Sequence, residues 1–206
     1  KQSIVILDDD PTGTQTLYDV PIITSWEVEA IEKEFLGATP LFFILTNSRS
    51  LTEEETIALH KMISQNLAKA AKKTTREFLI ISRSDSTLRG HYPIEVDVLQ
   101  QYIYKSEIIK IIIPAFFEGN RLTLNDTHYV KEEDELLPVA ESKYAQDKYF
   151  GYQSSNLKAW VEEKSKGKIK AADVFSISLS MIREEGPTAV ARFLKELPAD
   201  ASVVVN

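Results

Sequence analysis

Short apolar runs alternate with longer amphipathic segments along the whole chain. The runs are about four to six residues long, are rich in Ile, Val, Leu and Phe, and are continuous rather than alternating. Continuous runs of this kind are typical of strands that are covered on both faces, as in parallel sheets. Strands are predicted at residues 3–7, 21–24, 41–45, 78–82 and 108–113, and two later ones at residues 174–178 and 202–205.

Helical patterns fill most of the gaps between these runs. The clearest covers residues 51–72, and its start allows a capping box between Ser50 and Glu53 or between Thr52 and Glu55. Further helices are predicted at residues 28–35, from Pro93 to about Ile103, at 155–164 and at 187–197. Strands separated by helices predict an α/β fold, a Rossmann-like layered domain with a mostly parallel central sheet flanked by helices.

Two segments depart from this alternation. Residues 120–153 contain few periodic apolar positions and many Tyr, Asp and Glu, so we expect a long ordered excursion with a short hairpin. Connections of that length without structure of their own are uncommon unless they are functional. The segment 202–206 resembles the middle of a strand, so we expect the chain to be the amino-terminal part of a larger protein.

Composition and charge restrict the class of protein. The 206 residues are 43% hydrophobic and 27% charged, which is typical of a globular domain, and the net charge is −7. An acidic chain is a poor general binder of nucleic acid, because phosphates are bound by clustered Lys and Arg. The absence of cysteine excludes a disulfide scaffold, a thiolate metal site and a cysteine nucleophile. No apolar run approaches the roughly 20 residues of a membrane span, and we predict a cytoplasmic domain.

The first strand is followed directly by an acidic cluster. Asp8, Asp9 and Asp10 are consecutive, and such carboxylates need a cation, a bound hydroxyl group or raised pKa values. The backbone N–H groups near Thr12 and Gly13 could meet an anion. Because functional residues of α/β sheets gather at the carboxyl ends of the strands, we interpret this cluster as functional. The alternative is a solvated acidic turn.

Two further polar clusters follow the strands at residues 41–45 and 78–82. They supply guanidinium, carboxylate and hydroxyl groups, which bind the carboxylates and hydroxyls of a ligand. The first contains Arg49, and the second contains Arg83, Asp85, Ser86, Thr87, Arg89 and Gly90. The alternatives are a serine-rich loop that caps the next helix and, for Arg89, an exposed salt bridge to Glu95.

A fourth polar cluster, residues 114–123, follows the strand at 108–113, and its Arg121 could add another guanidinium. Of the histidines, we expect His128 to be a structural residue and His60 to lie on the helix surface. Acids at one strand end and arginines at others fit a small, polyhydroxylated, anionic ligand. The arginines would hold its carboxylate and the aspartates its hydroxyls.

Four stretches of the chain, residues 8–15, 46–49, 83–90 and 114–116, resemble the amino-terminal domain of the four-carbon acid sugar kinase family. The resemblance implies a two-domain kinase that uses ATP and Mg²⁺ to phosphorylate erythronate, threonate or 3-oxo-tetronate. Residues 1–206 would be its substrate-binding domain, and a carboxyl-terminal domain outside this chain would carry most of the nucleotide site. The absence of a Gly-x-x-x-x-Gly-Lys-Ser/Thr phosphate loop agrees with that division.

The resemblance also assigns roles to residues. Asp9 or Asp10 would be the base or the hydroxyl-orienting residue, and no metal ligand is assigned in this chain. The residues expected to bind the substrate are Thr12, Gly13, Arg49, Arg83, Asp85, Ser86, Thr87, Arg89 and Gly90. The expected partners are the acid sugar and the chain's own carboxyl-terminal domain. A homo-oligomer is compatible with the sequence, and the 206-residue chain alone is expected to be inactive.

Two alternatives remain open. In a phosphatase of the haloacid dehalogenase type, Asp8 would be the nucleophile and Asp10 the acid/base. Pro11 interrupts that signature, and no Gly-Asp-x-x-x-Asp motif follows a later strand. A non-catalytic module that binds sugar acids would have a similar pocket.

Overall fold

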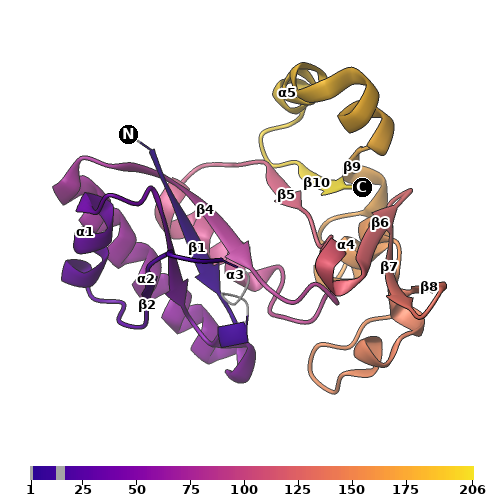
Figure 1. The fold of residues 1–206 in the computed structure, drawn as a ribbon, viewed down its shortest axis with the longest axis horizontal. Coiled ribbons are helices and arrows are strands. Elements are labelled where there is room, and N and C mark those ends of the chain that lie inside the picture. Colours follow the sequence, from indigo (N-terminus) through magenta and orange to yellow (C-terminus); the bar gives the residue numbers. More distant parts are fainter. Residues whose placement is uncertain (1, 13–16) are drawn as a thin grey trace. The chain divides into compact units, whose positions relative to one another are not determined.

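The computed structural model describes residues 2–12 and 17–206, which form two compact units (Figure 1). Unit 1 contains the chain up to Ser84 together with Gly90–Ser106. Unit 2 contains Asp85–Arg89 and Glu107–Asn206. The predicted α/β class is confirmed, and the parallel strands are distributed over one sheet in each unit.

Unit 1 is a parallel sheet with helices packed on one face. The strand order is β2 (Ile22–Ile23), β3 (Leu41–Leu45), β1 (Gln2–Asp8) and β4 (Glu77–Arg83). Its helices are α1 (Val28–Leu36), α2 (Glu53–Thr74) and α3 (Ile94–Leu99), and a π-helical turn, Gln100–Tyr104, follows α3. The core between sheet and helices consists of buried aliphatic and aromatic side chains, among them Val5, Leu7, Ile31, Phe35, Phe42, Ile44, Ile63 and Leu67.

Helix α2 begins as predicted from one of the two candidate capping boxes. The side chain of Thr52 accepts from the N–H of Glu55, and the Glu55 carboxylate accepts from the N–H of Thr52. The prediction that His60 lies on the surface is wrong. His60 is buried on the inner face of α2, where its Nδ1 donates to the carbonyl of Thr56 at 3.0 Å. The buried face of α2 contains Leu59, Ile63 and Leu67, which repeat every four residues. It also includes His60, the residue next to Leu59, so it is wider than a single stripe of apolar positions.

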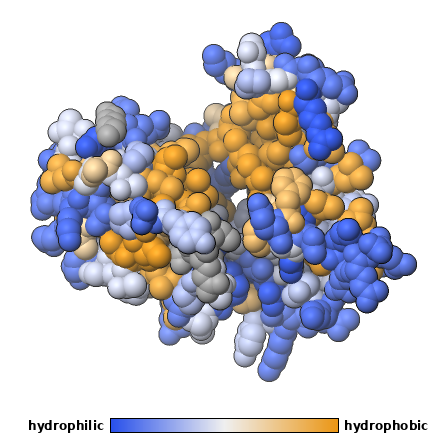
Figure 2. Space-filling model, in the orientation of Figure 1, coloured by the Kyte–Doolittle hydropathy of each residue, from blue (hydrophilic) through white to orange (hydrophobic). Residues whose placement is uncertain are grey.

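The opposite face of the unit 1 sheet carries partly exposed apolar side chains. Ile4, Leu79 and Ile81 are 37%, 48% and 43% exposed. Figure 2 shows hydrophobic surface on unit 1 where Figure 1 places β1 and β4. Within the described part of the chain, no helix combines the length and apolar character that a membrane crossing requires.

Unit 2 contains a parallel and an antiparallel sheet. The parallel sheet has the order β5 (Lys110–Ile112), β10 (Ser202–Val205) and β9 (Val174–Ile177). Helix α5 (Gly186–Glu196) packs on it through a cluster that includes Ile177, Val190, Phe193, Leu194 and Val203. Helix α4 (Leu157–Lys164) is capped by the side chain of Asn156, which accepts from two backbone N–H groups.

The segment predicted to be an excursion contains the antiparallel sheet. Strands β6 (Arg121–Leu124), β7 (Thr127–Glu132) and β8 (Glu135–Pro138) form a meander, so the predicted hairpin is present and has a third strand. Asn125 and Asp126 join β6 to β7 with φ values of 49° and 62°. Two left-handed residues are what a two-residue hairpin turn requires.

Candidate functional site

The strand register of unit 1 brings three polar loops to one sheet edge. Asp8, the last residue of β1, pairs with Leu45 of β3 and with Arg83 of β4. The residues just after these strand ends are also hydrogen-bonded. The N–H of Thr46 donates to the carbonyl of Asp8 at 2.9 Å, and the N–H of Asp9 donates to the carbonyl of Arg83 at 3.3 Å. The residues that follow β1, β3 and β4 therefore meet at the carboxyl ends of parallel strands, where α/β sheets bind ligands.

Asp9 is the centre of this cluster. Arg49 donates two hydrogen bonds to its carboxylate, from Nε to Oδ2 at 3.0 Å and from Nη2 to Oδ1 at 2.6 Å. The hydroxyl of Ser84 donates to Oδ2 at 2.7 Å. The Asp9 side chain is only 3% exposed. A buried carboxylate needs such compensation, and a two-point guanidinium contact fixes its orientation.

The two neighbouring carboxylates have different surroundings. The side chain of Asp8 is fully buried, with Arg83 Nη1 at 3.2 Å, and burial raises its pKa although Arg83 acts in the opposite direction. Asp10 is 28% exposed and its pKa is lowered, chiefly by a hydrogen bond from the Thr12 hydroxyl at 2.5 Å. Asp10 is therefore the most accessible of the three carboxylates and is ionised at neutral pH.

Gly90 allows the loop after β4 to approach Asp9. Its φ is +148°, and a Cβ atom at this position would collide with the Ser84 hydroxyl and lie 3.5 Å from Asp9 Oδ2. The predicted binding residue Gly90 thus lies against the carboxylate cluster of unit 1. Gly13, also predicted to bind substrate, lies outside the described residues.

The buried position of Glu95 beside this cluster was not predicted from the sequence. The interpretation of Glu95 as an exposed partner of Arg89 is wrong, because its side chain is buried and accepts from Ser48 Oγ at 2.6 Å. Burial raises its pKa to about 7, and the charge of Asp9 acts in the same direction. The sequence signal was its spacing of three residues from the buried Val98 on α3.

The remaining predicted residues belong to unit 2. Arg89 Nε donates to Asp85 Oδ2 at 2.5 Å, and the hydroxyl of Thr87 donates to the same oxygen. The carbonyl of Ser86 accepts from Nε2 of His128 at 2.7 Å. His128 is buried and fully hydrogen-bonded, so the structural role predicted for it is confirmed.

Three cationic side chains of unit 2 lie close to the aromatic ring of Tyr144. The guanidinium of Arg89 lies 5.0 Å from the centre of its ring, that of Arg121 lies 5.6 Å away, and the ammonium of Lys143 lies 5.5 Å away. Arg121 Nη2 also donates to the Tyr144 hydroxyl at 3.3 Å. Its Nε is buried and has no hydrogen-bond partner among the described residues. An arginine beside an aromatic ring gains a cation–π contact, and its planar guanidinium matches the geometry of a carboxylate.

The described residues do not offer a metal site. No group of three or more His, Asp or Glu side chains in residues 2–12 and 17–206 is arranged to hold a metal ion. The carboxylates of Asp8, Asp9 and Asp10 are instead directed at arginines and hydroxyls.

Comparisons with known proteins agree with this architecture. A family model described as "sugar-binding N-terminal domain" matches residues 4–206. No curated protein matches the chain. A domain of unknown function (DUF1537) from Bordetella bronchiseptica, solved with bound citrate as a domain-swapped dimer, is 21% identical, with a TM-score of 0.71 over 98% of this chain and 46% of that chain.

A DUF1537 protein from Haemophilus influenzae is 17% identical, with a TM-score of 0.68 over 98% of this chain and 47% of that chain. Identities at this level establish a shared fold. The chain spans less than half the length of either structure.

Proposed function

Because this chain belongs to the family of sugar-binding N-terminal domains, we propose that it is the substrate-binding part of a four-carbon acid sugar kinase. The observation that carries the proposal is the carboxylate cluster at the end of β1. Asp9 is fixed by Arg49, while the ionised Asp10 beside it is accessible. This arrangement suits a hydroxyl group that must be held for attack on a phosphoryl group.

Asp10 is the better candidate for the residue that orients the accepting hydroxyl. Phosphoryl transfer has a loose transition state, so catalysis depends mainly on position and electrostatics rather than on a strong base. The carboxylate of Asp9 is occupied by Arg49 and Ser84, whereas the contacts of Asp10 within residues 2–12 and 17–206 are Thr12 and a more distant Arg49 at 3.5 Å. In this proposal Asp9 holds Arg49 in position, and Asp10 accepts the hydrogen bond of the substrate hydroxyl.

Within unit 2, we propose the arginines beside Tyr144 as a second binding site for a carboxylate. Arg89 and Arg121 are the natural ligands of a carboxylate because their guanidinium groups bind it at two points. Citrate, a hydroxylated carboxylic acid, is bound in the Bordetella structure, which supports a hydroxy acid as the ligand class. ATP and Mg²⁺ would be held by residues outside this chain.

The phosphatase alternative loses support from the position of Asp8. A nucleophile must reach the phosphorus atom of a substrate, but the Asp8 side chain is fully buried and paired with Arg83.

Calorimetric titration of the 206-residue chain with threonate and with erythronate tests the proposal. We expect one of them to bind. Asp10→Asn should weaken binding at the unit 1 cluster, and Arg89→Ala should weaken binding at the unit 2 cluster, each at least about tenfold, since each substitution removes a charge-assisted hydrogen bond. Arg192→Ala, which removes an exposed arginine of α5, is the matched control and should leave affinity unchanged. Equal affinity in all four proteins, or no binding of either acid, would overturn the proposal.

A further inference from the structure

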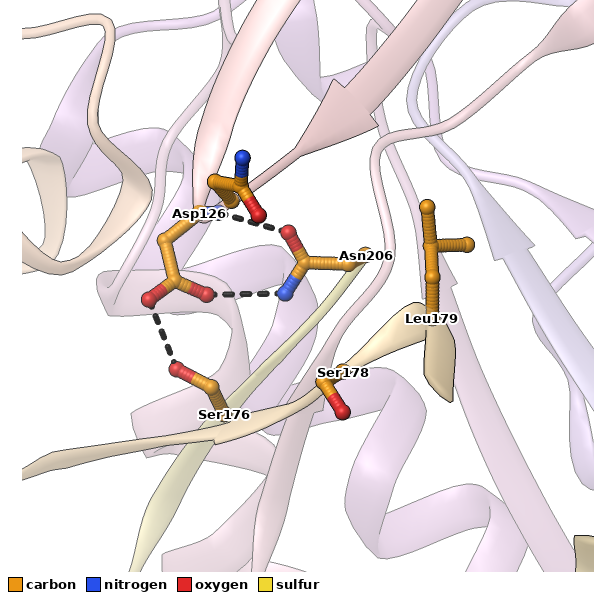
Figure 3. Close-up of a pocket in the computed structure, with 6 residues that line it drawn as sticks. Asp126, Ser176, Ser178, Leu179 and Asn206 are labelled. Atoms are coloured by element: carbon orange, nitrogen blue, oxygen red, sulfur yellow. Dashed lines mark hydrogen bonds between the residues drawn. The ribbon is translucent and has the colours of Figure 1, made fainter. Parts of the chain in front are cut away.

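A separate polar pocket lies in unit 2, at the carboxyl ends of two parallel strands (Figure 3). Its volume is about 250 Å³. It is lined by Asn125 and Asp126 of the β6–β7 turn, Ser176, Ser178 and Leu179 at the end of β9, and Asn206 after β10. None of these residues belongs to the clusters described above, so the pocket is independent of the proposed function.

The polar side chains of the pocket hold one another in fixed positions. Asp126 Oδ1 accepts from Asn206 Nδ2 and Oδ2 accepts from Ser176 Oγ, both at 2.8 Å (Figure 3). Asn206 Oδ1 in turn accepts from the N–H of Asp126 at 2.5 Å. Each carboxylate oxygen can accept two hydrogen bonds, so Asp126 retains acceptor capacity on both oxygens. A carboxylate fixed in this way is preorganised for a ligand with paired donors.

The electrostatics of the pocket narrow the class of ligand. Lys158 Nζ lies 3.5 Å from Asp126 Oδ2, so an ammonium group of the chain already faces this carboxylate. The acceptor oxygens of Asp126 would repel a phosphate or carboxylate group. Two adjacent hydroxyls match them, because a carboxylate accepts from both members of a diol, as acidic residues do with ribose in dinucleotide sites.

The position and size of the pocket agree with that chemistry. Ligands of α/β proteins bind outside the carboxyl ends of parallel strands, and Ser178 and Asn206 directly follow the ends of β9 and β10. Leu179 adds an apolar wall against which the carbon face of a sugar ring can pack. We propose that this pocket binds the vicinal diol of a neutral sugar, either a free pentose or the ribose of a nucleoside.

Titration of the ¹⁵N-labelled chain with D-ribose, adenosine and 2′,3′-dideoxyadenosine, observed by NMR, tests this proposal. We expect saturable shifts of the Asp126 and Asn206 amide signals with a diol-bearing probe, and binding at least about tenfold weaker for the dideoxy nucleoside. Similar affinity for ribose and adenosine identifies a free sugar as sufficient, and binding of adenosine alone identifies a nucleoside. The absence of shifts with both, or equal binding of the dideoxy compound, would overturn the proposal.

Two substitutions assign any binding to the pocket. Asp126→Asn removes the negative charge, and Leu179→Trp fills the space without removing any hydrogen bond of the network. The second variant keeps the test decisive if the first fails to fold. Leu136→Trp adds the same bulk at an exposed position of β8 and is the matched control. Loss of binding at least about tenfold in Leu179→Trp but not in Leu136→Trp supports the site, and equal binding in the two variants refutes it.

Discussion

At the scale of single residues, the three consecutive aspartates after β1 show how position controls charge. Alternate side chains of an extended segment point in opposite directions, so neighbours meet different partners. Asp8 points into the protein and toward Arg83, and burial raises its pKa. Asp9 meets Arg49, whereas Asp10 stays accessible with a lowered pKa. One acidic tripeptide therefore supplies a buried, a fixed and an accessible carboxylate.

Glu95 gives a prediction about pH. Its pKa is raised from 4.5 to about 7, chiefly by burial and also by Asp9, while Arg49 acts in the opposite direction and His60 Nε2 lies 3.7 Å away. The folded chain therefore holds this proton more tightly than the unfolded chain. Its stabilising contribution is complete below pH 4.5 and is lost as the pH rises through about 7.

We therefore expect Glu95→Gln to reduce the fall in stability between pH 4.5 and 8. The amide oxygen can still accept from Ser48, but the side chain cannot ionise. At pH 8 the variant should be more stable than the wild type, on the order of 2–3 kcal/mol. Urea unfolding at several pH values measures this, with Glu54→Gln on the exposed face of α2 as control. Equal pH dependence in all three proteins would contradict the argument.

Gly90 gives a prediction about backbone strain and close approach. Gly90→Ala places a Cβ on the Ser84 hydroxyl and should break the hydrogen bond from Ser84 to Asp9. Gly186→Ala is the control, because Gly186 also has a positive φ, of +77°, but a Cβ atom added there would have no neighbouring atom within 4 Å. Both substitutions introduce backbone strain of about 1–3 kcal/mol. Gly90→Ala should cost at least about 1 kcal/mol more in thermal unfolding. Equal losses would show that Ser84 accommodates the methyl group.

At the scale of elements, the start of α2 is set by local chemistry. Thr52 and Glu55 satisfy each other's backbone N–H groups, and the helix then continues for 22 residues. Thr52→Ala removes one side of the box and should destabilise the chain by about 1 kcal/mol. Chemical unfolding measures the difference, and Glu54→Ala is the control within the same turn. A loss equal to that of Glu54→Ala would show that packing alone fixes the start of the helix.

Most elements could be predicted because their signals are local. Continuous apolar runs identified the parallel strands, although one face of the unit 1 sheet is partly exposed, and the Thr52–Glu55 pair was one of two predicted helix starts. Strands β7 and β8 were harder to predict because their solvent side carries Lys and Glu, so the run of apolar residues is interrupted. The Asn125–Asp126 pair was the available signal for their hairpin, since both residue types tolerate the left-handed region.

The candidate site could be predicted in part. Residues at strand ends follow from the α/β fold, which identified Asp9, Asp10 and Arg49 as candidates. The pairing of Asp9 with Arg49 spans 40 residues and has no local signal. The stacking of arginines on Tyr144 depends on side-chain positions from three distant segments, so sequence pattern did not indicate it.

At the scale of the whole molecule, the segment Asp85–Arg89 is the unusual feature of the chain. It follows β4 of unit 1 after a single residue, Ser84, yet it is part of unit 2. Thr87 and Leu88 are buried there. Two side chains anchor its backbone, because the Tyr152 hydroxyl donates to the carbonyl of Thr87 at 2.6 Å and His128 donates to that of Ser86. These anchors fix the backbone two and three residues before Arg89.

Removal of one anchor should therefore affect both stability and binding. Burial raises the pKa of Tyr152, so its hydroxyl stays a neutral donor, and Tyr152→Phe leaves the Thr87 carbonyl buried without that partner. We expect a loss of about 1–3 kcal/mol in unfolding free energy, faster hydrogen exchange at the Leu88 amide, and weaker acid-sugar binding through Arg89. Tyr149→Phe, at an exposed position, is the control. If Tyr152→Phe lowers stability while the Leu88 amide and the affinity match those of the control, the hydroxyl serves packing alone and does not position Arg89.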